Sequence, residues 1–257
     1  MRTSLRGRVA AYGLAVWIAA CGGGGGGGAE EPQGLGLEDL NLDGRIVILA
    51  FGDSITRGVG DGPGAESTPP ASVAGYPARL QQLLTPRATL PLVVVNDGRA
   101  GERTTSGVSR LQRDLGTNSP DYVILLEGAN DVQEGDVEGA ANRMQTMIDA
   151  VFGAGAQPLL GTITPSCCAH RNALNFGAET GYNGRLRSIA AADLVPVIDF
   201  YAAFTNGPGV NGEDLPYDQN LGLIHVPEGL HPTPAGYDLM ATAAWEVFTG
   251  APSARGG

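Results

Sequence analysis

The sequence predicts a three-layer α/β/α fold, in which helices cover both faces of a five-stranded parallel sheet. Short, almost continuous apolar runs alternate along the chain with longer amphipathic segments, and this alternation is typical of βα units. The apolar runs lack the polar alternation of a sheet with one solvent-exposed face, so each strand is expected to be covered on both sides. With 257 residues, 42% of them hydrophobic, the chain is long enough to form such a core.

Five apolar runs are the expected strands, and five amphipathic segments are the expected helices. The strands are expected at residues 46–51, 92–96, 122–127, 158–162 and 195–199. The helices are expected at residues 76–84, 106–115, 137–152, 182–192 and 234–248. Pro234 opens the last helix, in the first turn, where the N–H that proline lacks would have no partner. In the third helix the apolar side chains fall on one stripe, which predicts core packing rather than a cofactor site.

The N-terminus has the organisation of a secretory signal. Three arginines precede an apolar stretch at residues 9–18, which is too short to span a bilayer, and Ala19 and Ala20 form a small-residue cleavage site. Because Cys21 follows at once, residues 1–20 resemble a bacterial lipoprotein signal peptide; an ordinary signal peptide is the alternative. We therefore expect a bacterial cell-envelope protein that is anchored to a membrane by a lipid on Cys21 and faces the periplasm or the cell surface.

Composition divides the rest of the chain into three parts. Residues 21–44 begin, after Cys21, with seven consecutive glycines and continue as acidic sequence with further Gly and Pro, which predicts a flexible tether. Residues 45–250 are expected to fold as one domain, and residues 251–257 to form a disordered tail. The net charge of −11 argues against nucleic acid as a partner.

Two metal-like patterns are incomplete, so neither a metal nor a cofactor is expected. Residues 39–44 match the first half of a calcium-binding EF-hand loop, but Ala50 stands where the loop needs its closing acidic ligand. Cys167, Cys168 and His170 lack the second pair of ligands that a zinc site requires. In an oxidising compartment two states of the adjacent cysteines remain open: a disulfide between them, or thiols that are free or paired with another chain.

Four polar motifs lie where a doubly wound sheet places its functional residues, in the loops that follow strands. Ser54 follows the first strand in a Gly-Asp-Ser turn, Gly101 lies in the loop after the second strand, and Asn130 follows the third. His231 lies in a Gly-Leu-His-Pro segment before the last helix. Ser, Gly, Asn and His in this order resemble the SGNH, or GDSL-type, hydrolases, a family of esterases and lipases. The resemblance covers essentially residues 45–250.

The resemblance implies a flavodoxin-like parallel sheet and the chemistry of a serine hydrolase. Ser54 would attack an ester carbonyl, and His231 would serve as the general base that activates it. The family's oxyanion hole maps onto the backbone N–H groups of Ser54 and Gly101 and the side-chain amide of Asn130. Glycine at position 101 would let the backbone approach the substrate closely.

The acid of the predicted triad departs from the family pattern. The family usually carries Asp three residues before the histidine, and that position is Glu228 here. A Glu can still hold the working tautomer of the imidazole, so Glu228 is the assigned acid. Asp214 and Asp218 lie in the same long loop and are the alternatives. Asp53, beside the nucleophile, is expected to shape the turn.

These observations predict a serine esterase or acylhydrolase that cleaves small or medium carboxylic esters, including esters carried by glycans or lipids. Carbohydrate O-deacetylase and lysophospholipase or thioesterase activities occur in the same family and are the alternatives. A carbohydrate-binding surface lipoprotein on a degenerate hydrolase scaffold is the non-enzymatic alternative. The presence of Ser54, Gly101, Asn130 and His231 argues against that last interpretation.

Overall fold

The computed structural model describes residues 37–170, 181–205 and 222–250. The chain divides into two compact units, Met1–Pro32 and Gln33–Gly257, and every described residue belongs to the second. Several sequence predictions concern residues outside the described ones: the signal peptide, Cys21, most of the tether, Asp214, Asp218 and the tail.

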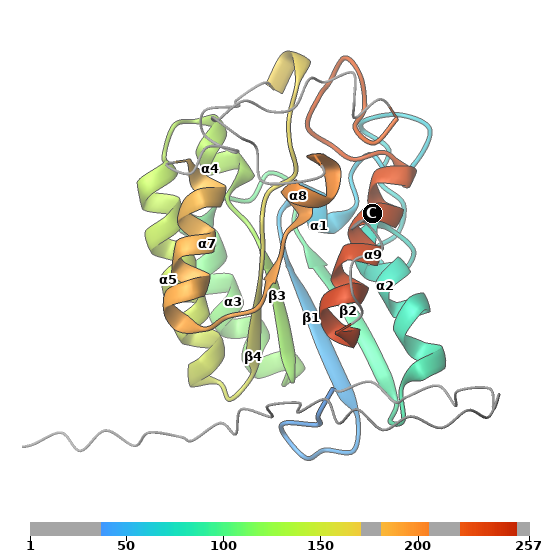
Figure 1. Cartoon of the computed structure of the whole chain (residues 1–257), viewed down its shortest axis with the longest axis vertical. Helices are drawn as coiled ribbons and strands as arrows, with labels where there is room; N and C mark the ends of the chain where they lie inside the picture. Colours follow the sequence, from blue (N-terminus) through green and yellow to red (C-terminus); the bar gives the residue numbers. More distant parts are fainter. Residues whose placement is uncertain (1–36, 171–180, 206–221, 251–257) are drawn as a thin grey trace, which may run out of the picture. The chain divides into compact units, whose positions relative to one another are not determined.

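Five parallel strands form one sheet, as predicted, and their order in it is β2-β1-β3-β4-β5. Figure 1 labels the first four of them. The strands are β1 (Ile46–Gly52), β2 (Leu92–Gly98), β3 (Tyr122–Leu126), β4 (Gln157–Gly161) and β5 (Val197–Ile198). Every residue of β1 is buried, because β1 lies between β2 and β3 and helices cover both faces of the sheet. The order reverses between β1 and β3, so the carboxyl ends of these two strands border the crevice in which such sheets bind ligands.

Helices cover both faces of the sheet and complete the predicted three layers (Figure 1). On one face α3 (Thr104–Asn118) packs on α5 (Val137–Gly153), and α5 packs on α7 (Tyr182–Asp193). On the other face α2 (Gly75–Leu84) packs on α9 (Pro234–Thr249). The predicted stripe of α5 is confirmed as core, since its buried side chains are Ala140, Ala141, Met144, Met147, Ile148 and Val151.

Short helices that the sequence did not predict lie between these elements. They are α1 (Ser54–Arg57), α4 (Ala129–Gln133), α8 (Phe200–Thr205) and the 3₁₀ turns Thr85–Arg87 and Cys168–His170. Each is shorter than two helical turns, so no apolar period can show in its sequence. α1 begins where it does because the Asp53 carboxylate accepts a hydrogen bond from the Ile55 N–H, at 2.9 Å, and so caps the first turn. Asp53 therefore shapes the turn, as predicted.

The described N-terminal segment, residues 37–44, contacts the domain. Leu37 and Leu40 pack against the hydrophobic core. The Leu40 N–H also donates to the carboxylate of Asp121, just before β3, at 2.7 Å. This last part of the predicted tether is thus held at the amino end of the sheet.

Candidate active site

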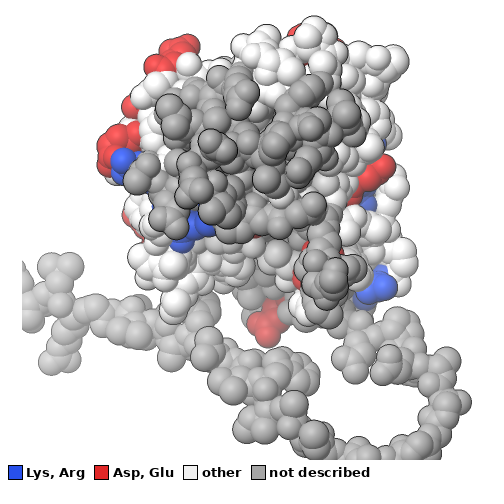
Figure 2. All heavy atoms as spheres, turned by 45° about the horizontal axis from the view of Figure 1, so that its top comes forward, with Lys and Arg blue, Asp and Glu red and all other residues white. Residues whose placement is uncertain are grey.

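A cavity of about 380 Å³ lies among the loops that follow β1, β2 and β3 and the segment that precedes α9. The structure brings the five predicted site residues of the domain to this one cavity: Ser54, Gly101, Asn130, Glu228 and His231 all line it. Figure 2 turns the carboxyl end of the sheet toward the viewer; on the described surface, Arg and acidic side chains form small, separate groups.

Ser54 and His231 lie within hydrogen-bonding distance of each other. Ser54 opens α1 directly beyond β1, and its Oγ is 3.0 Å from Nε2 of His231. His231 reaches this position from the segment before α9, a helix that Thr233 caps through its side chain. An imidazole that keeps its proton on Nδ1 can accept the hydroxyl proton of Ser54 on Nε2.

Glu228 lies on the far side of the imidazole ring. Its Oε1 is 3.0 Å from Nδ1 of His231, and its Oε2 accepts hydrogen bonds from the backbone N–H groups of Leu230 and His231, both at 2.9 Å. Burial favours a raised pKa for Glu228, but the hydrogen bonds from His231 and Leu230 outweigh it and lower the pKa to about 2. Nδ1 of His231 and Oε1 of Glu228 are close enough for a hydrogen bond, but the angle at the Nδ1 hydrogen is unfavourable. A small rotation of the imidazole ring would complete this hydrogen bond. The longer side chain of Glu thus reaches Nδ1 of His231 from the position in the sequence where the family usually carries Asp.

The two other predicted oxyanion donors come from separate loops. Gly101 has φ +74°, and an added Cβ would meet nothing within 4 Å, so glycine is needed here for its left-handed backbone rather than for space in the unliganded structure. Asn130 lies in the first turn of α4, and its Nδ2 donates to the backbone carbonyl of Glu102 at 2.7 Å. A side-chain amide has two N–H groups, so the second one is left to donate into the cavity.

The cysteine segment after β4 packs on the loop that carries Glu228. The Cys167 N–H donates to the Gly229 carbonyl at 2.8 Å. Gly229 has φ +88°, and a Cβ there would lie 2.1 Å from the carbonyl oxygen of Cys167, so only glycine allows this approach. The Sγ atoms of Cys167 and Cys168 are 2.6 Å apart, and the structure holds both residues as thiols. A disulfide between them stays a prediction.

Sequence reasoning missed the place of His170. Its Nε2 lies 3.5 Å from Oε1 of Glu228, and it lines the cavity with Val59, Glu66, Thr68, Ala100 and Leu230. No pattern in the sequence signals this contact, because it depends on hydrogen bonds between two loops that are far apart in the chain. Within the described ranges, no three or more His, Cys, Asp or Glu side chains are grouped so that they could hold a metal ion.

Two acidic side chains are buried behind the nucleophile. Asp53 is 0% exposed, and burial raises its pKa to about 6. Glu127, at the end of β3, is also 0% exposed; burial, and next the negative charge of Asp53, raise its pKa well above the usual value. Neither residue lines the cavity. Both therefore influence the site through the packing and the electrostatics beneath it.

Comparison with known proteins gives the chain its family. Residues 50–239 match the sequence model of the GDSL-like lipase/acylhydrolase family. The crystal structure of a lipase/acylhydrolase from Enterococcus faecalis is 25% identical, with a TM-score of 0.60 over 80% of this chain and 96% of that one.

Two more distant structures share the fold. A psychrotrophic esterase from Pseudoalteromonas is 18% identical, with a TM-score of 0.58 over 78% of this chain and 95% of that one. A family 3 carbohydrate esterase from Clostridium thermocellum is 21% identical, with a TM-score of 0.55 over 80% and 95%. A comparison with curated protein sequences found no match. With the family motifs gathered around one cavity, and a family match over most of its length, the chain belongs to the GDSL-like lipase/acylhydrolase family.

Proposed function

We propose that this protein is a serine esterase that hydrolyses short to medium carboxylic esters through Ser54, His231 and Glu228. The observation that carries the proposal is the continuous line of contacts from Ser54 Oγ through the imidazole of His231 to Glu228, each step 3.0 Å long. This line ends in a cavity that also contains Gly101 and Asn130. A nucleophile, a base, an orienting acid and oxyanion donors are the parts that acyl transfer requires.

In the first half of the reaction Ser54 Oγ attacks the ester carbonyl carbon while Nε2 of His231 takes the hydroxyl proton. Glu228 stabilises the imidazolium that forms and keeps its Nδ1 proton in place. The negative charge that develops on the carbonyl oxygen is met by the backbone N–H groups of Ser54 and Gly101 and by the amide of Asn130. The tetrahedral intermediate collapses when His231 returns the proton to the leaving alcohol, which leaves an acyl ester on Ser54.

In the second half a water molecule takes the place of the alcohol. His231 accepts a proton from the water as its oxygen attacks the acyl carbon, and the same donors stabilise the second tetrahedral intermediate. Collapse then breaks the bond to Ser54 Oγ, which recovers its proton from His231. The products are one carboxylic acid and one alcohol, and no cofactor takes part.

The size of the cavity supports a small substrate. A volume of about 380 Å³ is near the lower end of ligand sites, and its apolar lining side chains, Val59, Ala100 and Leu230, are short. Acyl groups of a few carbons fit such a lining. We therefore propose a preference for short acyl chains over long ones.

A panel of esters with a common alcohol and acyl chains of increasing length tests this function. We expect kcat/KM to be highest for the short chains, and a fluorophosphonate probe to label the wild-type protein but not Ser54→Ala. Acetylated sugars and lysophospholipids in the same panel test the deacetylase and lysophospholipase alternatives, and an acyl thioester tests the thioesterase. A protein that is neither labelled nor active on any ester would contradict the proposal and favour the carbohydrate-binding alternative.

We further propose that the mature protein is attached to a membrane of the bacterial cell envelope by a lipid on Cys21. The basis is the signal-like sequence that ends at Ala20. None of the described helices has the length and the apolar composition to cross a membrane. Cys21→Ser should move the protein from the detergent phase to the aqueous phase, or leave it unprocessed. Mass spectrometry that finds an unmodified mature N-terminus elsewhere would contradict this attachment.

A further inference from the structure

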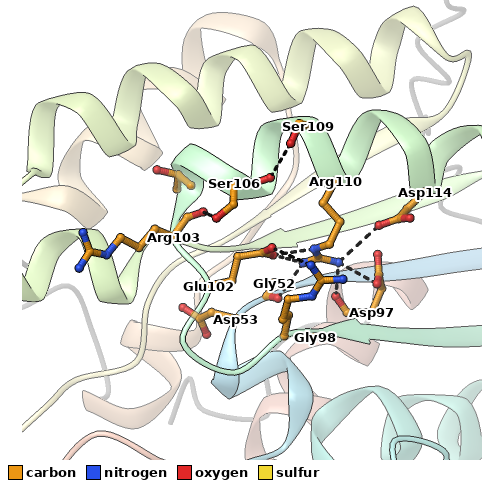
Figure 3. A network of polar contacts seen from close by, with 12 residues as sticks. Gly52, Asp53, Asp97, Gly98, Glu102, Arg103, Ser106, Ser109, Arg110 and Asp114 are labelled. Atoms are coloured by element: carbon orange, nitrogen blue, oxygen red, sulfur yellow. Dashed lines mark hydrogen bonds and ion pairs between the residues drawn. The ribbon is translucent and has the colours of Figure 1, made fainter.

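Arg110 is a fully buried cation next to the site, and the catalytic steps above make no use of it. It lies on α3, is 1% exposed, and its guanidinium group lies over the ring of Phe51, 3.8 Å from the centroid. Nη2 donates to the Gly52 carbonyl at 3.1 Å, and Nη1 donates to the Asp97 carbonyl at 2.9 Å. Figure 3 shows the side chain pointing from α3 toward the ends of the strands that carry Gly52 and Asp97. Arg110 thus joins the carboxyl ends of β1 and β2.

Glu102 is the most deeply buried of the three carboxylates that pair with this arginine; the others are Asp97, whose Oδ1 lies 2.7 Å from Nη1, and Asp114. Glu102 is 5% exposed, and its Oε2 accepts a hydrogen bond from Nε of Arg110 at 2.6 Å (Figure 3). A second contact joins Nη2 of Arg110 to the same oxygen. A buried carboxylate without a partner is costly, so this pair strongly restrains where the backbone of Glu102 can lie.

The backbone of Glu102 is connected to two of the three proposed oxyanion donors. Glu102 follows Gly101 directly in the chain, so its position fixes the peptide beside the Gly101 N–H. Its own carbonyl accepts the hydrogen bond from Nδ2 of Asn130 at 2.7 Å, which orients that amide. One residue therefore links donors that come from two different loops.

We propose that the Arg110–Glu102 ion pair positions the oxyanion hole, through its hold on the Gly101 N–H and the Asn130 amide. This inference rests on the proposed esterase function of the same site. Arg110 and Glu102 are positioning residues, since neither lines the cavity. Donors that are fixed before the reaction stabilise the transition state without reorganisation, and a shift of about 0.5 Å is enough to weaken them.

A matched control lies on the opposite side of the same guanidinium group. Asp114 Oδ2 is 3.6 Å from Nη1 of Arg110, one turn further along α3, and it has no contact with Glu102 or with the cavity. Asp114→Asn removes one negative charge from the surroundings of Arg110, as Glu102→Gln does; Asp114 also interacts with Asp97, but it is not part of the loop that carries Gly101 and Glu102. The Asp114 contact is longer and more exposed than the Glu102 contact, so this variant tests whether the loss of any one carboxylate from Arg110 is enough to disturb the site.

The experiment compares wild type, Glu102→Gln and Asp114→Asn on an ester that the wild type hydrolyses. For Glu102→Gln we expect kcat to fall about tenfold to a hundredfold, somewhat less than the loss of a whole oxyanion donor, while KM stays within about twofold. The affinity for an alkylboronic acid, which mimics the tetrahedral intermediate, should fall in proportion to kcat/KM. Asp114→Asn should stay within about twofold of wild type in every measurement. Equal losses in the two variants, or a loss confined to KM, would overturn the proposal.

A second measurement separates this inference from the proposed function. The backbone amide of Gly101 and the side-chain amide of Asn130 are observable by nuclear magnetic resonance without any substrate. Both resonances should shift or broaden in Glu102→Gln and stay unchanged in Asp114→Asn. If they respond in this way in a protein that hydrolyses no ester, the proposed function fails and the positioning stands. If they do not respond, the positioning is wrong whatever the activity.

Discussion

The two ends of the sheet bury an aspartate in opposite ways. At the amino end Asp121, which is 0% exposed, accepts hydrogen bonds from three backbone N–H groups, those of Leu40, Asn41 and Val47. At the carboxyl end Asp53, also 0% exposed, accepts one backbone hydrogen bond, from Ile55. The backbone N–H of Ala129 also interacts with Asp53, but only weakly. The second carboxylate oxygen of Asp53 has no partner with hydrogen-bond geometry among the described residues.

The two buried aspartates contribute differently to the stability of the fold. A buried carboxylate costs free energy unless hydrogen bonds replace its water, so Asp121 stabilises the fold while Asp53 does not. The Ala129 N–H and the other groups that lower the pKa of Asp53 do not offset its burial, which raises that pKa to about 6. Glu127 adds a second poorly satisfied acid at the same end, with no hydrogen bond to either carboxylate oxygen among the described residues. The carboxyl end thus keeps polar groups near the cavity at a cost in stability.

The comparison predicts that changes to the cavity residues at the carboxyl end alter activity far more than stability, and Ser54→Ala should show this most strongly. Loss of the nucleophile should lower kcat by roughly 10⁶-fold. The free energy of unfolding should change by about 1 kcal/mol or less, because the hydroxyl makes a single hydrogen bond within the described part of the chain, to His231. Ester hydrolysis and thermal melting measure the two effects. Ser109→Ala, at an exposed serine of α3, is the control, and substantial activity in Ser54→Ala would refute the assignment.

Glu228→Gln should have the next largest effect. The amide keeps the shape of the side chain but no longer favours the tautomer of His231 with its proton on Nδ1, so kcat should fall by up to about 10⁴-fold. Glu228→Asp should be milder, since it restores the usual residue of the family. A double variant with His231→Ala should lose little more than His231→Ala alone, because the two residues act as one unit.

The activity of Glu228→Ala can contradict the assignment of Glu228 as the acid. If Glu228→Ala keeps more than about a third of the wild-type kcat/KM, a loss of only ~0.6 kcal/mol, Glu228 is not the acid. Single alanine substitutions at Asp214 and Asp218 then become the next measurement.

Asn130→Ala should lower kcat by about a hundredfold to a thousandfold, the usual effect of removing one oxyanion donor. KM should change little, because the donor acts on charge that develops in the transition state. An asparagine at the amino end of the sheet is the matched control: Asn118 donates to the Asp114 carbonyl at 2.8 Å and lies far from the cavity lining. Equal kinetic losses in Asn130→Ala and Asn118→Ala would contradict the role of Asn130.

The sequence was sufficient to predict the framework and the residues around the cavity. Apolar runs located the five strands to within a few residues, because strands that are covered on both faces are largely apolar. The expectation that every strand is covered on both sides fails at β2, an edge strand with no fully buried residue. Motifs placed Ser54, Gly101, Asn130 and His231 after strands or before a helix, and parallel strands bring such loops to one end of the sheet. The five site residues consequently line one cavity, although their chemical roles stay predictions.

The buried charges could not be predicted in the same way. Arg110 stands next to Leu111 in an amphipathic helix, where a charged residue is expected to face solvent. It is buried because Glu102, which is near in the chain, and the carbonyl of Gly52, which is distant, supply its partners together. Glu127 ends an apolar run, a position at which a charge also suggests exposure. Partners that come from several loops leave no periodic signal in the sequence.

At the amino end, Asp121→Ala should reduce stability and leave catalysis unchanged. Three backbone N–H groups lose their acceptor, and we expect the free energy of unfolding to fall by about 4 kcal/mol. Denaturant unfolding measures this loss, while kcat and KM should match wild type at a temperature where the variant stays folded. Asp149→Ala, at an exposed aspartate of α5, is the control. A stable Asp121→Ala with low kcat would reverse the comparison between the two ends.

Asp53→Asn should have the smallest effect and the opposite sign, since it should stabilise the protein at neutral pH. Asn keeps an oxygen that can accept the Ile55 N–H, and it resembles the protonated form of Asp53. The folded-state pKa of Asp53 is raised from 3.8 to about 6, so the unfolded chain ionises first as the pH rises. Wild-type stability from this group is therefore full below pH 3.8, falls between the two pKa values, and is constant above the folded one.

The gain in Asp53→Asn should follow that curve, from near zero at pH 3.5 to at most about 3 kcal/mol at pH 8, the equivalent of about two pKa units. Asp136→Asn provides a control of opposite sign at another helix N-terminus. Hydrogen bonding to Arg143 lowers the pKa of Asp136, so its contribution is present above the usual aspartate pKa and is lost in acid. Asp136→Asn should thus destabilise at pH 8 and be neutral in acid. Urea unfolding of both variants across this pH range measures the two slopes, and parallel slopes would mean that burial does not penalise the charge of Asp53.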